Sequence, residues 1–533
     1  MKYSYIFFGA VFFILCSVIF IPAQDIEPDE PEIILPSVVL EIEDLSVEKI
    51  RSGLPEEIEQ PLPWREYPLP EPEELEIEES SFEISAPDEE HTAPEEGRRD
   101  LIAEVTLGAG IPSHFIGSIS LFKFGELPEG KLLFHHEMLD GIGSNSPGIG
   151  YNMREDILEG MVRFDIGDVE FKTDGEFVDL ERGLQGNSNF YSKINRRLSG
   201  DISLKYAISD QFILKGRVDG SVSSQLLTGT SFQQINEFLI SPEVTGELQM
   251  ENWYLGITPE LSYRNVLEKN GLLTTRFQLR VDVGIDIGEK YRIDAQASWF
   301  YSEASNHLFP FYLGLTGTPT DFFMFRVNAG YKLLQYNLKD IFAEYEFSSV
   351  PDTLLDNHGW FVDLMSRLYI TDRWMLNAEA SFMKHSGMFT VDKSIDPVTG
   401  LFTPDQVEAL SLNVLFGARW NITDRIFAQF NAGAEFLDRP QFFPQYSLGA
   451  QLDATQEEGK YGGGVSADLL LGEHDYIQVP ILDLYGFYRP ADFIKFQLDI
   501  NDLLLPIVSQ QRYSWYPYIE EGFKITLKTQ INF

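Results

Sequence analysis

The sequence contains a single cysteine, Cys16, among 533 residues. Because this cysteine lies in the apolar run that opens the chain, removal of that run would leave a protein without thiols. Disulfide frameworks, cysteine-ligated zinc sites and cysteine nucleophiles would then be excluded. The lack of cysteine in the rest of the chain is compatible with export.

Basic residues are also scarce. Lys and Arg number 40 against 83 Asp and Glu, and the formal net charge is -43. Nucleic-acid binding requires a basic face that neutralises phosphates, so this composition argues against nucleic-acid partners. For the same reason it argues against peripheral docking on anionic lipid.

Long apolar runs are missing beyond residue 23. Charges and glycines interrupt every later apolar stretch before it reaches the roughly 18 residues that a transmembrane helix needs. A membrane-embedded form of this chain must therefore cross with strands or bind the membrane by association.

The first residues have the order of a secretory signal. Lys2 supplies a positive charge, an apolar run of about 17 residues follows, and small Ala23 precedes the first acidic residues. We expect residues 1–23 to form a signal peptide that is cleaved after Ala23. The alternatives are an uncleaved anchor and a lipoprotein attached at Cys16, although Leu15 is larger than a lipoprotein signal requires.

Residues 24–99 are acidic and rich in proline. They hold about 25 acidic and five basic residues, a composition that cannot bury enough apolar surface to offset chain entropy. We expect a disordered periplasmic segment. Within residues 33–67, a few apolar side chains stand out as anchors that could fold onto a periplasmic protein, the alternative being a plain tether. The partner-binding candidates are Val38, Leu40, Ile42, Leu45, Val47 and Trp64.

From residue 100 onward the pattern changes to a period of two. In the run 276–287, Phe277, Leu279 and Val281 share one face, whereas Gln278 and Arg280 share the other, as in a two-sided strand. Such runs are about 9 to 14 residues long, close to the 9–11 that cross a bilayer, and aromatics cluster at their ends. Residues 100–533 are therefore expected to be an all-β, transmembrane antiparallel barrel.

Connections between the runs alternate in length. Short polar turns with an acidic residue occur at positions 209–212, 288–291, 371–374, 423–426 and 490–493. Longer segments rich in Gly, Pro and Asn are expected as loops at positions 140–156, 225–236, 385–405 and 504–520. Short turns on one side and long loops on the other are typical of outer-membrane barrels.

The last strand alternates up to a terminal aromatic residue. It resembles the C-terminal strand of bacterial outer-membrane proteins, which their assembly machinery reads. The residues that carry this resemblance are Ile525, Leu527, Ile531 and Phe533. The resemblance implies a protein of the outer membrane that contacts its lipid and its assembly machinery. If successive runs are paired as hairpins, the N-terminal segment and the C-terminus both fall on the short-turn side, which is expected to face the periplasm.

If successive runs are paired as hairpins, the sequence contains about 22 strands, within a range of about 16 to 24. This pattern resembles the barrel of TonB-dependent receptors. That family carries a globular plug before its barrel, and the segment 24–99 is too short, acidic and proline-rich to be one. Energised uptake is therefore not implied, and a plugless, porin-like or fatty-acid-transporter-like barrel fits the sequence.

No catalytic constellation is apparent. The one histidine cluster is His135-His136-Glu137. His135 and His136 are adjacent in a strand and should face opposite sides, so we do not expect them to share a metal. The glycine-rich stretch 141–150 lacks the lysine of a phosphate loop, and no nucleophile motif accompanies His307 or His385. We expect no enzymatic activity, no cofactor and no metal.

The polar faces assigned to the barrel interior are acidic. The residues concerned are Asp282, Asp286, Asp294, Glu379, Asp468 and Asp499. An open lumen of this kind should favour cations, whereas the alternative is a merely solvated face. The leading hypothesis is a transport or assembly component with a periplasmic docking or gating arm. The alternatives are a structural barrel that binds a protein partner and, third, a secreted soluble β-protein.

Overall fold

The computed structural model describes residues 101–533, apart from short gaps, and these residues belong to one compact unit. The gaps are residues 126, 144, 146, 230–231, 268–272, 438–444, 457–458, 473–478 and 509–511. The expected signal peptide and acidic segment, residues 1–23 and 24–99, lie outside the described residues, and so do the six partner-binding candidates between Val38 and Trp64.

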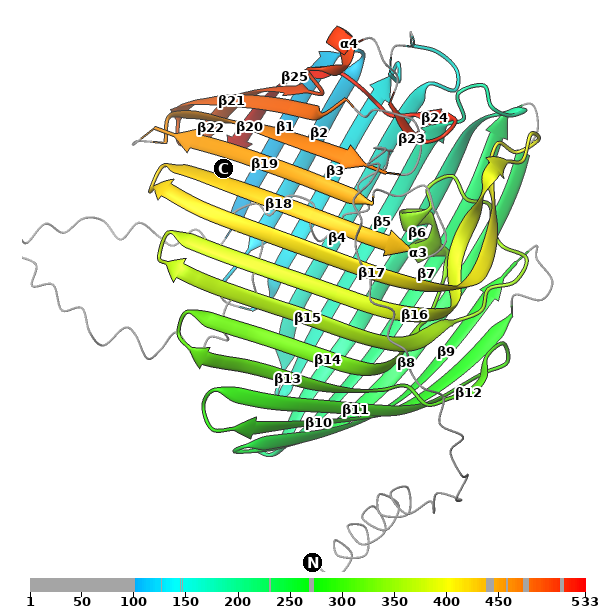
Figure 1. The fold of residues 1–533 in the computed structure, drawn as a ribbon, viewed down its shortest axis with the longest axis vertical. Coiled ribbons are helices and arrows are strands. Elements are labelled where there is room, and N and C mark those ends of the chain that lie inside the picture. Colours follow the sequence, from blue (N-terminus) through cyan, green and yellow to red (C-terminus); the bar gives the residue numbers. More distant parts are fainter. Residues whose placement is uncertain are drawn as a thin grey trace, which may run out of the picture. The chain divides into compact units, whose positions relative to one another are not determined.

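The described chain is built mainly of strands (Figure 1). The first half contains β1 (Leu101–Ile111), β2 (His114–Lys123), β3 (Glu129–Asp140), β4 (Asn152–Ile166), β5 (Val169–Gly183), β6 (Phe190–Ser209), β7 (Phe212–Gly229), β8 (Phe232–Met250), β9 (Trp253–Val266), β10 (Thr274–Ile287), β11 (Tyr291–Ser302), β12 (Asn306–Leu308), β13 (Phe311–Thr320) and β14 (Phe323–Leu334). The second half contains β15 (Asn357–Thr371), β16 (Trp374–Ile395), β17 (Phe402–Thr423), β18 (Ile426–Leu437), β19 (Tyr446–Thr455), β20 (Tyr461–Leu471), β21 (Ile481–Ala491), β22 (Ile494–Asn501), β23 (Tyr513–Trp515), β24 (Tyr518–Ile519) and β25 (Lys524–Asn532).

The sheet closes on itself as a 22-strand antiparallel barrel. Each long strand pairs with the next along the chain, and short β12 adds to β11. β25 completes the ring because it pairs with β22 on one side and with β1 on the other, where Val105 lies opposite Ile531. Closure leaves no open sheet edge, which is the condition for strands to cross a membrane. The expected transmembrane barrel of about 22 strands is confirmed.

Alternation along each strand separates two surfaces. In β10, Leu279 and Ile285 are 36% and 45% exposed, whereas Arg276 on the other face is 3% exposed. The apolar side chains therefore point outward, where lipid rather than water would surround them, and the polar ones point into the barrel. A band of exposed Leu, Ile, Val and Phe around the wall would be unfavourable in water.

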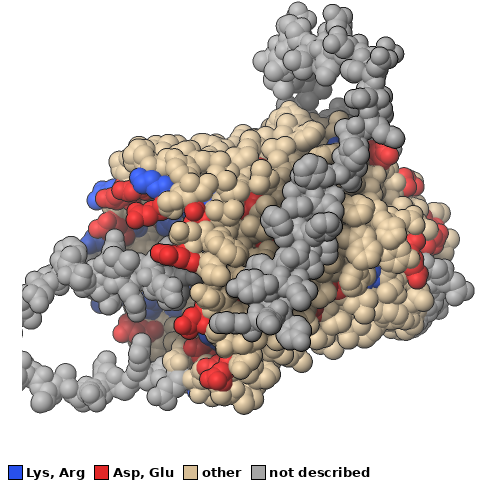
Figure 2. Space-filling model, turned by 90° about the horizontal axis from the view of Figure 1, so that it is seen from below, with Lys and Arg blue, Asp and Glu red and all other residues tan. Residues whose placement is uncertain are grey.

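Aromatic side chains lie near both edges of this outward band. Trp253, Tyr291 and Tyr488 are exposed close to one end of the strands, and Tyr301 and Trp360 are exposed close to the other. On the face seen in Figure 2, most of the visible charged side chains gather toward the two ends of the barrel. This is the distribution of a wall that spans a bilayer with interfacial aromatic girdles.

The two ends of the barrel differ in their connections. At the end where β25 finishes, hereafter the turn end, the five expected turns join consecutive strands within a few residues. At the opposite end, hereafter the loop end, residues 141–151, 335–356 and 502–523 form long connections. The expected asymmetry is thus observed.

The prediction of loops at positions 225–236 and 385–405 is wrong. β7 and β8 continue through the interval 225–236 and leave only residues 230–231 between them, and β16 and β17 fill most of 385–405. The glycines, prolines and polar residues there do not end the strands because cross-strand pairing continues, with Thr228 opposite Phe232 and Val391 opposite Pro404.

Helices play a small part. The described residues contain α3 (Leu338–Glu344) and α4 (Leu505–Val508), both at the loop end. Neither is long and apolar enough to span a membrane, nor is any other helix of the described residues.

Candidate functional site

Four loop-end segments fold inward and pack on one another. They are the described residues of segments 184–189, 335–356, 396–401 and 502–523, which together are called the cap. Figure 1 shows α3, in the second of these segments, lying inside the ring of strands. The cap has its own apolar core, to which Leu184, Leu338, Leu401 and Tyr518 contribute from the four segments.

The cap core joins opposite walls of the barrel. The same cluster includes Phe190 on β6 and Leu227 on β7, and also Phe389 on β16 and Phe402 on β17. β6 and β17 lie roughly half the ring apart in the order of pairing. A single packed cluster that touches both walls therefore crosses the barrel at its loop end.

Aromatic contacts hold the cap segments together. The rings of Phe347 and Tyr518 are stacked, with centroids 3.8 Å apart and an interplanar angle of 4°. The Tyr518 hydroxyl donates a hydrogen bond to the carbonyl of Gly400. Gly400 has a φ of +73° and no room for a Cβ beside this hydroxyl and Ser188. The packing therefore requires glycine at that position.

Buried cations on the wall bind the backbone of segment 335–356. Arg264, 1% exposed, donates from Nη1 to the carbonyl of Tyr336 at 2.7 Å and from Nη2 to that of Leu354 at 3.4 Å. Lys193 donates to the carbonyls of Glu346 and Ser348. These two side chains satisfy carbonyl groups that the inserted loop takes out of water.

A buried charged anchor is the pair formed by Arg276 and Asp356. Arg276 Nη2 lies 2.5 Å from Asp356 Oδ1, and the two side chains are 3% and 1% exposed. The hydroxyls of Ser302 and Ser305 donate to the other carboxylate oxygen at 3.3 and 3.2 Å. Because both charges are desolvated, removing either partner would leave an uncompensated buried charge.

Two side chains accept hydrogen bonds from backbone N–H groups in the first turn of α3. Glu237 on β8 accepts a hydrogen bond from the Leu338 backbone N–H at 2.9 Å, and the Asn337 side chain accepts one from Asp340 N. These acceptors satisfy N–H groups that have no partner within the helix. The wall thus fixes where α3 begins.

A chain of ion pairs connects the cap to the opposite part of the wall. Arg182 on β5 donates to Glu346 and, at 3.0 Å, to Glu521, and Lys524 Nζ lies 2.7 Å from Glu521. Burial favours the neutral form of Glu521, but Lys524 and Arg182 outweigh that effect and hold its pKa at about 2. Glu521 is therefore ionised at neutral pH.

A cavity of about 270 Å³ lies beside these ion pairs. Its lining includes Arg182, Glu346, Arg512, Glu521 and Lys524. The charged groups of the lining largely pair with one another, and Arg512 also forms a two-point contact with Asp502 at 2.6 and 3.1 Å. Polar and apolar side chains, such as Asp483 and Ile481, line this cavity between them, and they come from both the cap and the wall.

The acidic residues expected in the lumen do lie on the inward faces, but several are paired. Asp282 accepts from Arg280 at 3.1 Å, Asp294 from Arg292 at 2.9 Å, and Asp499 Oδ2 lies 2.7 Å from Lys528 Nζ. Within the described part of the chain, no ion pair within 4 Å is recorded for the other three. These are Asp286, Glu379 and Asp468. Pairing reduces the net field that the acidic residues alone would produce.

The histidines lie as their sequence spacing predicts. His135 is on the inward face of β3, and His136 is on the outward face, where its Nδ1 lies 2.6 Å from Asp156. His307 accepts a hydrogen bond from Trp299 at the exposed end of β11. His385 is buried below the cap, 2.7 Å from Ser411 and 2.9 Å from Asn357.

The residues of the expected assembly signal lie on one face of the last strand. Ile525, Leu527 and Ile531 of β25 lie opposite Ile111, Ala109 and Val105 of β1 on the outward surface. Leu527 and the following Phe533 are 57% and 61% exposed. The geometry presents these side chains to the outside of the wall.

The cap was not foreseen from the sequence. Segment 335–356 carries no period-two signal, but Leu338, Ile341, Phe342 and Tyr345 recur at helical spacing after Asn337, a residue favoured at helix N-termini. This pattern predicts a short amphipathic helix, and the structure contains it as α3. Nothing in the pattern shows that the helix lies inside the barrel.

Comparison with protein-family models and with curated proteins finds no match. Among solved structures, the chain is similar to the copper transporter OprC, with 10% identity, a TM-score of 0.61, and coverage of 81% of this chain and 80% of that one. The FrpB iron transporter from Neisseria meningitidis matches at 8% identity and a TM-score of 0.63, covering 82% and 81%. The ferric enterobactin receptor PfeA from Pseudomonas aeruginosa matches at 9% and 0.61, covering 81% of each chain.

The comparison defines the class of fold. These proteins are TonB-dependent receptor barrels, and the present chain forms a closed 22-strand barrel of the same kind, so the expected resemblance of the barrel is confirmed. These similar structures are named as transporters and a receptor.

Proposed function

We propose that this protein is an outer-membrane transport component whose pathway is closed by the cap at the loop end. The proposal is supported by the fold, which is similar to those of a copper transporter, an iron transporter and a ferric enterobactin receptor. The observation that carries it is the cap core, which joins the β6–β7 and β16–β17 walls across the barrel.

The nature of the anchors favours a gate over a permanent filling. The wall holds segment 335–356 largely through side chains that bind loop carbonyls and carboxylates, such as Lys193, Arg264 and Arg276. Hydrogen bonds that involve a charged group contribute about 1.5–3 kcal/mol each, and they can exchange for contacts with water or a ligand. A solute or partner that competes for these groups would shift the cap toward an open state.

The proposed orientation places the turn end in the periplasm and the loop end outside the cell. The described chain enters β1 at the turn end, and we assign residues 24–99, which precede β1 in the sequence, to the same side of the membrane. We assign to this segment the role of a docking or gating arm, with the apolar residues between Val38 and Trp64 as the contact points for a periplasmic protein. The outward face of β25, ending in Phe533, serves as the signal for the assembly machinery.

The first test is single-channel conductance of the refolded full-length protein in a planar bilayer. We expect long closed periods for the native chain. A variant in which residues 338–350 are replaced by a short Gly/Ser linker should conduct steadily, because α3 and much of the apolar core of the cap are removed. If this variant is folded and as silent as the native chain, the cap is not the gate. Steady conductance of the native chain would show that the cap does not close the pathway.

The arm is tested by deleting residues 24–99. If the segment gates the pore, the deletion should raise the open fraction, and an unchanged open fraction would contradict gating. If it docks a partner, a peptide of residues 30–67 should enrich a periplasmic protein from solution.

The alternative function is a structural barrel that holds a protein partner. The crossing of the barrel by a single packed core is the observation that favours it, because a filled mouth needs no transport pathway. The conductance of the cap-shortened variant decides between the two functions: an anchor with a filled interior stays silent, and a gated barrel conducts.

A further inference from the structure

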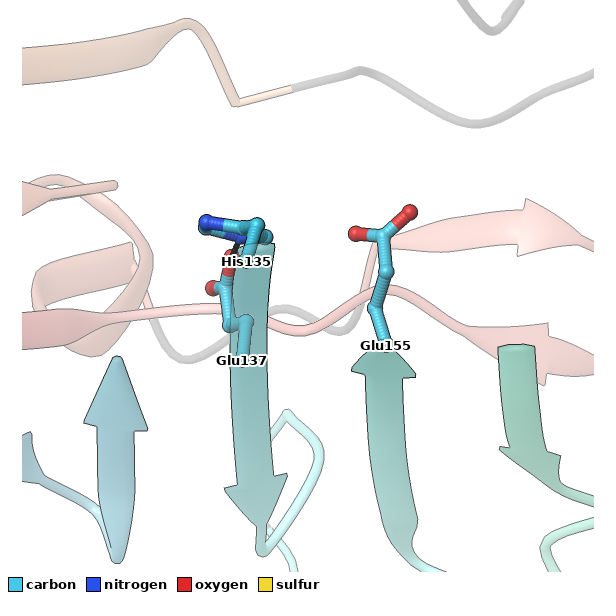
Figure 3. Close-up of side chains that lie close together, drawn as sticks. All are labelled: His135, Glu137 and Glu155. Carbon is cyan, nitrogen blue, oxygen red and sulfur yellow. Dashed lines mark ion pairs between the residues drawn. The ribbon is translucent and has the colours of Figure 1, made fainter. Parts of the chain in front are cut away.

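Three side chains with metal-ligating atoms converge on the inner wall, away from the cap core. His135 and Glu137 are two residues apart on β3 and therefore share a face. Glu155 on β4 lies directly opposite Glu137 in the strand register. Figure 3 shows the three side chains projecting from two neighbouring strands to the same side.

Their spacing is close to that of a metal centre. His135 Nε2 lies 3.8 Å from Glu137 Oε2, and one ligand atom from each of the three residues lies within 4.8 Å of the other two. Metal bonds to imidazole nitrogen and carboxylate oxygen are about 2.0–2.2 Å long, so ligands of one ion sit about 3–4 Å apart. Adjustments of carboxylate rotamers by less than about 1 Å would bring all three atoms to bonding distance.

Neighbouring groups already orient Glu137 for this role. Its Oε1 lies 2.9 Å from His114 Nε2 and 3.5 Å from Lys524 Nζ. His114 is buried, and its Nδ1 lies 2.6 Å from the Thr526 hydroxyl. A neutral His114 that accepts from Thr526 must carry its proton on Nε2 and donate to Glu137. Oε2 is left to face His135, and fixed hydrogen-bond partners of this kind strengthen metal ligands.

The chemistry of the ligand set selects the ion. Two carboxylates and one neutral imidazole carry a charge of about −2, which suits a divalent cation. A nitrogen ligand among oxygens favours a transition metal such as zinc, cobalt or manganese over calcium, which prefers oxygen alone. The side chains of His135 and Glu137 are 25% and 18% exposed toward the interior, so an ion in the barrel can reach them.

We propose that His135, Glu137 and Glu155 form a binding site for a divalent transition-metal ion on the inner wall of the barrel. The site departs from the expectation of no metal, which rested on the opposite orientations of His135 and His136 in the cluster 135–137. It connects to the cap, because Lys524 contacts both Glu137 and Glu521, and Glu521 binds Arg182. The site does not depend on solute transport.

The test is titration of the refolded full-length protein with Co²⁺ alone, followed by calorimetry and by the visible absorption of bound cobalt. We expect one ion per chain. His135→Ala should weaken binding by more than 100-fold, and His114→Ala by about 10- to 100-fold, the usual cost of removing a partner that orients a ligand. His136→Ala is the matched control, since this neighbour faces outward, and it should leave binding unchanged.

Folding of each variant is checked by heat-modified electrophoretic mobility. Glu155→Gln removes one ligand and keeps the shape of the side chain, so it replaces His135→Ala if that variant fails to fold. Cobalt binding that survives both ligand changes would overturn the proposal. So would the absence of any binding to the native chain at millimolar Co²⁺, which would leave the three residues as an ion-pair network of the wall.

Discussion

Replacing Asp356 with asparagine is expected to loosen the cap without disturbing the barrel. The change removes one charge from the buried pair with Arg276 but keeps an oxygen that can accept from Ser302 and Ser305. Breaking a buried ion pair costs about 3–5 kcal/mol. Because Arg276 also donates to the carbonyl of Tyr336 at 3.1 Å, the lower end of that range applies.

A cost of about 3 kcal/mol corresponds to a change of about 100-fold in the equilibrium between the closed and open cap. The assay uses Ile341→Cys as a reporter, since Ile341 on α3 is 1% exposed and the chain holds only one other cysteine. When closing is faster than labelling, the rate of modification by a maleimide follows the population of the open cap. We expect labelling about 100-fold faster in the presence of Asp356→Asn.

The matched control is Glu159→Gln. This change breaks the wall pair between Lys131 and Glu159, whose atoms lie 2.7 Å apart but whose side chains are 37% and 36% exposed. Such exposed pairs contribute about 0–1 kcal/mol, so labelling should change by less than about fivefold. If both variants are folded barrels and Asp356→Asn labels no faster than the control, the charged anchor does not hold the cap.

Two further predictions concern pH and assembly. The pKa of Glu521 lies below its ordinary value of 4.5, at about 2, so its contribution to cap stability is complete above about pH 4.5 and is lost as the pH falls toward 2. Burial raises the pKa of Glu344, which acts in the opposite direction because its protonation relieves the cost of a buried charge. We expect the open fraction of the native chain in planar bilayers to rise below pH 4.5. Glu521→Gln should raise the open fraction at neutral pH and make it depend less on pH. A variant with the same pH profile as the native chain would contradict this account. Deletion of Phe533 should lower the amount of folded, heat-modifiable protein in the membrane severalfold. Gln530→Ala, at an inward-facing position of the same strand, should leave that amount unchanged. Equal accumulation of the two variants would argue against a terminal signal.

The barrel follows from local features of the sequence. Successive residues of a strand such as β10 point to opposite faces. The faces of Leu279 and Arg280 can therefore be predicted from the sequence without knowing any contact with a distant residue. The expected turns follow for the same reason, because a few residues such as those at 423–426 set the turn by themselves. The number of runs then gives a strand count that the closed ring confirms.

The loops were harder to predict because composition alone does not end a strand. In the interval 385–405 the backbone groups are satisfied by pairing between β16 and β17, which extends the strands well past the polar and glycine residues. Whether a partner strand is present to accept those hydrogen bonds is a tertiary property.

The cap and the cluster of His135, Glu137 and Glu155 depend on tertiary contacts that the sequence does not reveal. Arg182 meets Glu521 across 339 positions of sequence, and Arg264 meets Tyr336 across 72. Glu137 faces Glu155 because of the register between β3 and β4, which no spacing within one strand reveals. The sequence by itself determined a two-sided wall, since each strand encodes its own alternation. Closure of the ring decided which inward side chains meet, because only then do distant strands and the loops between them share one interior.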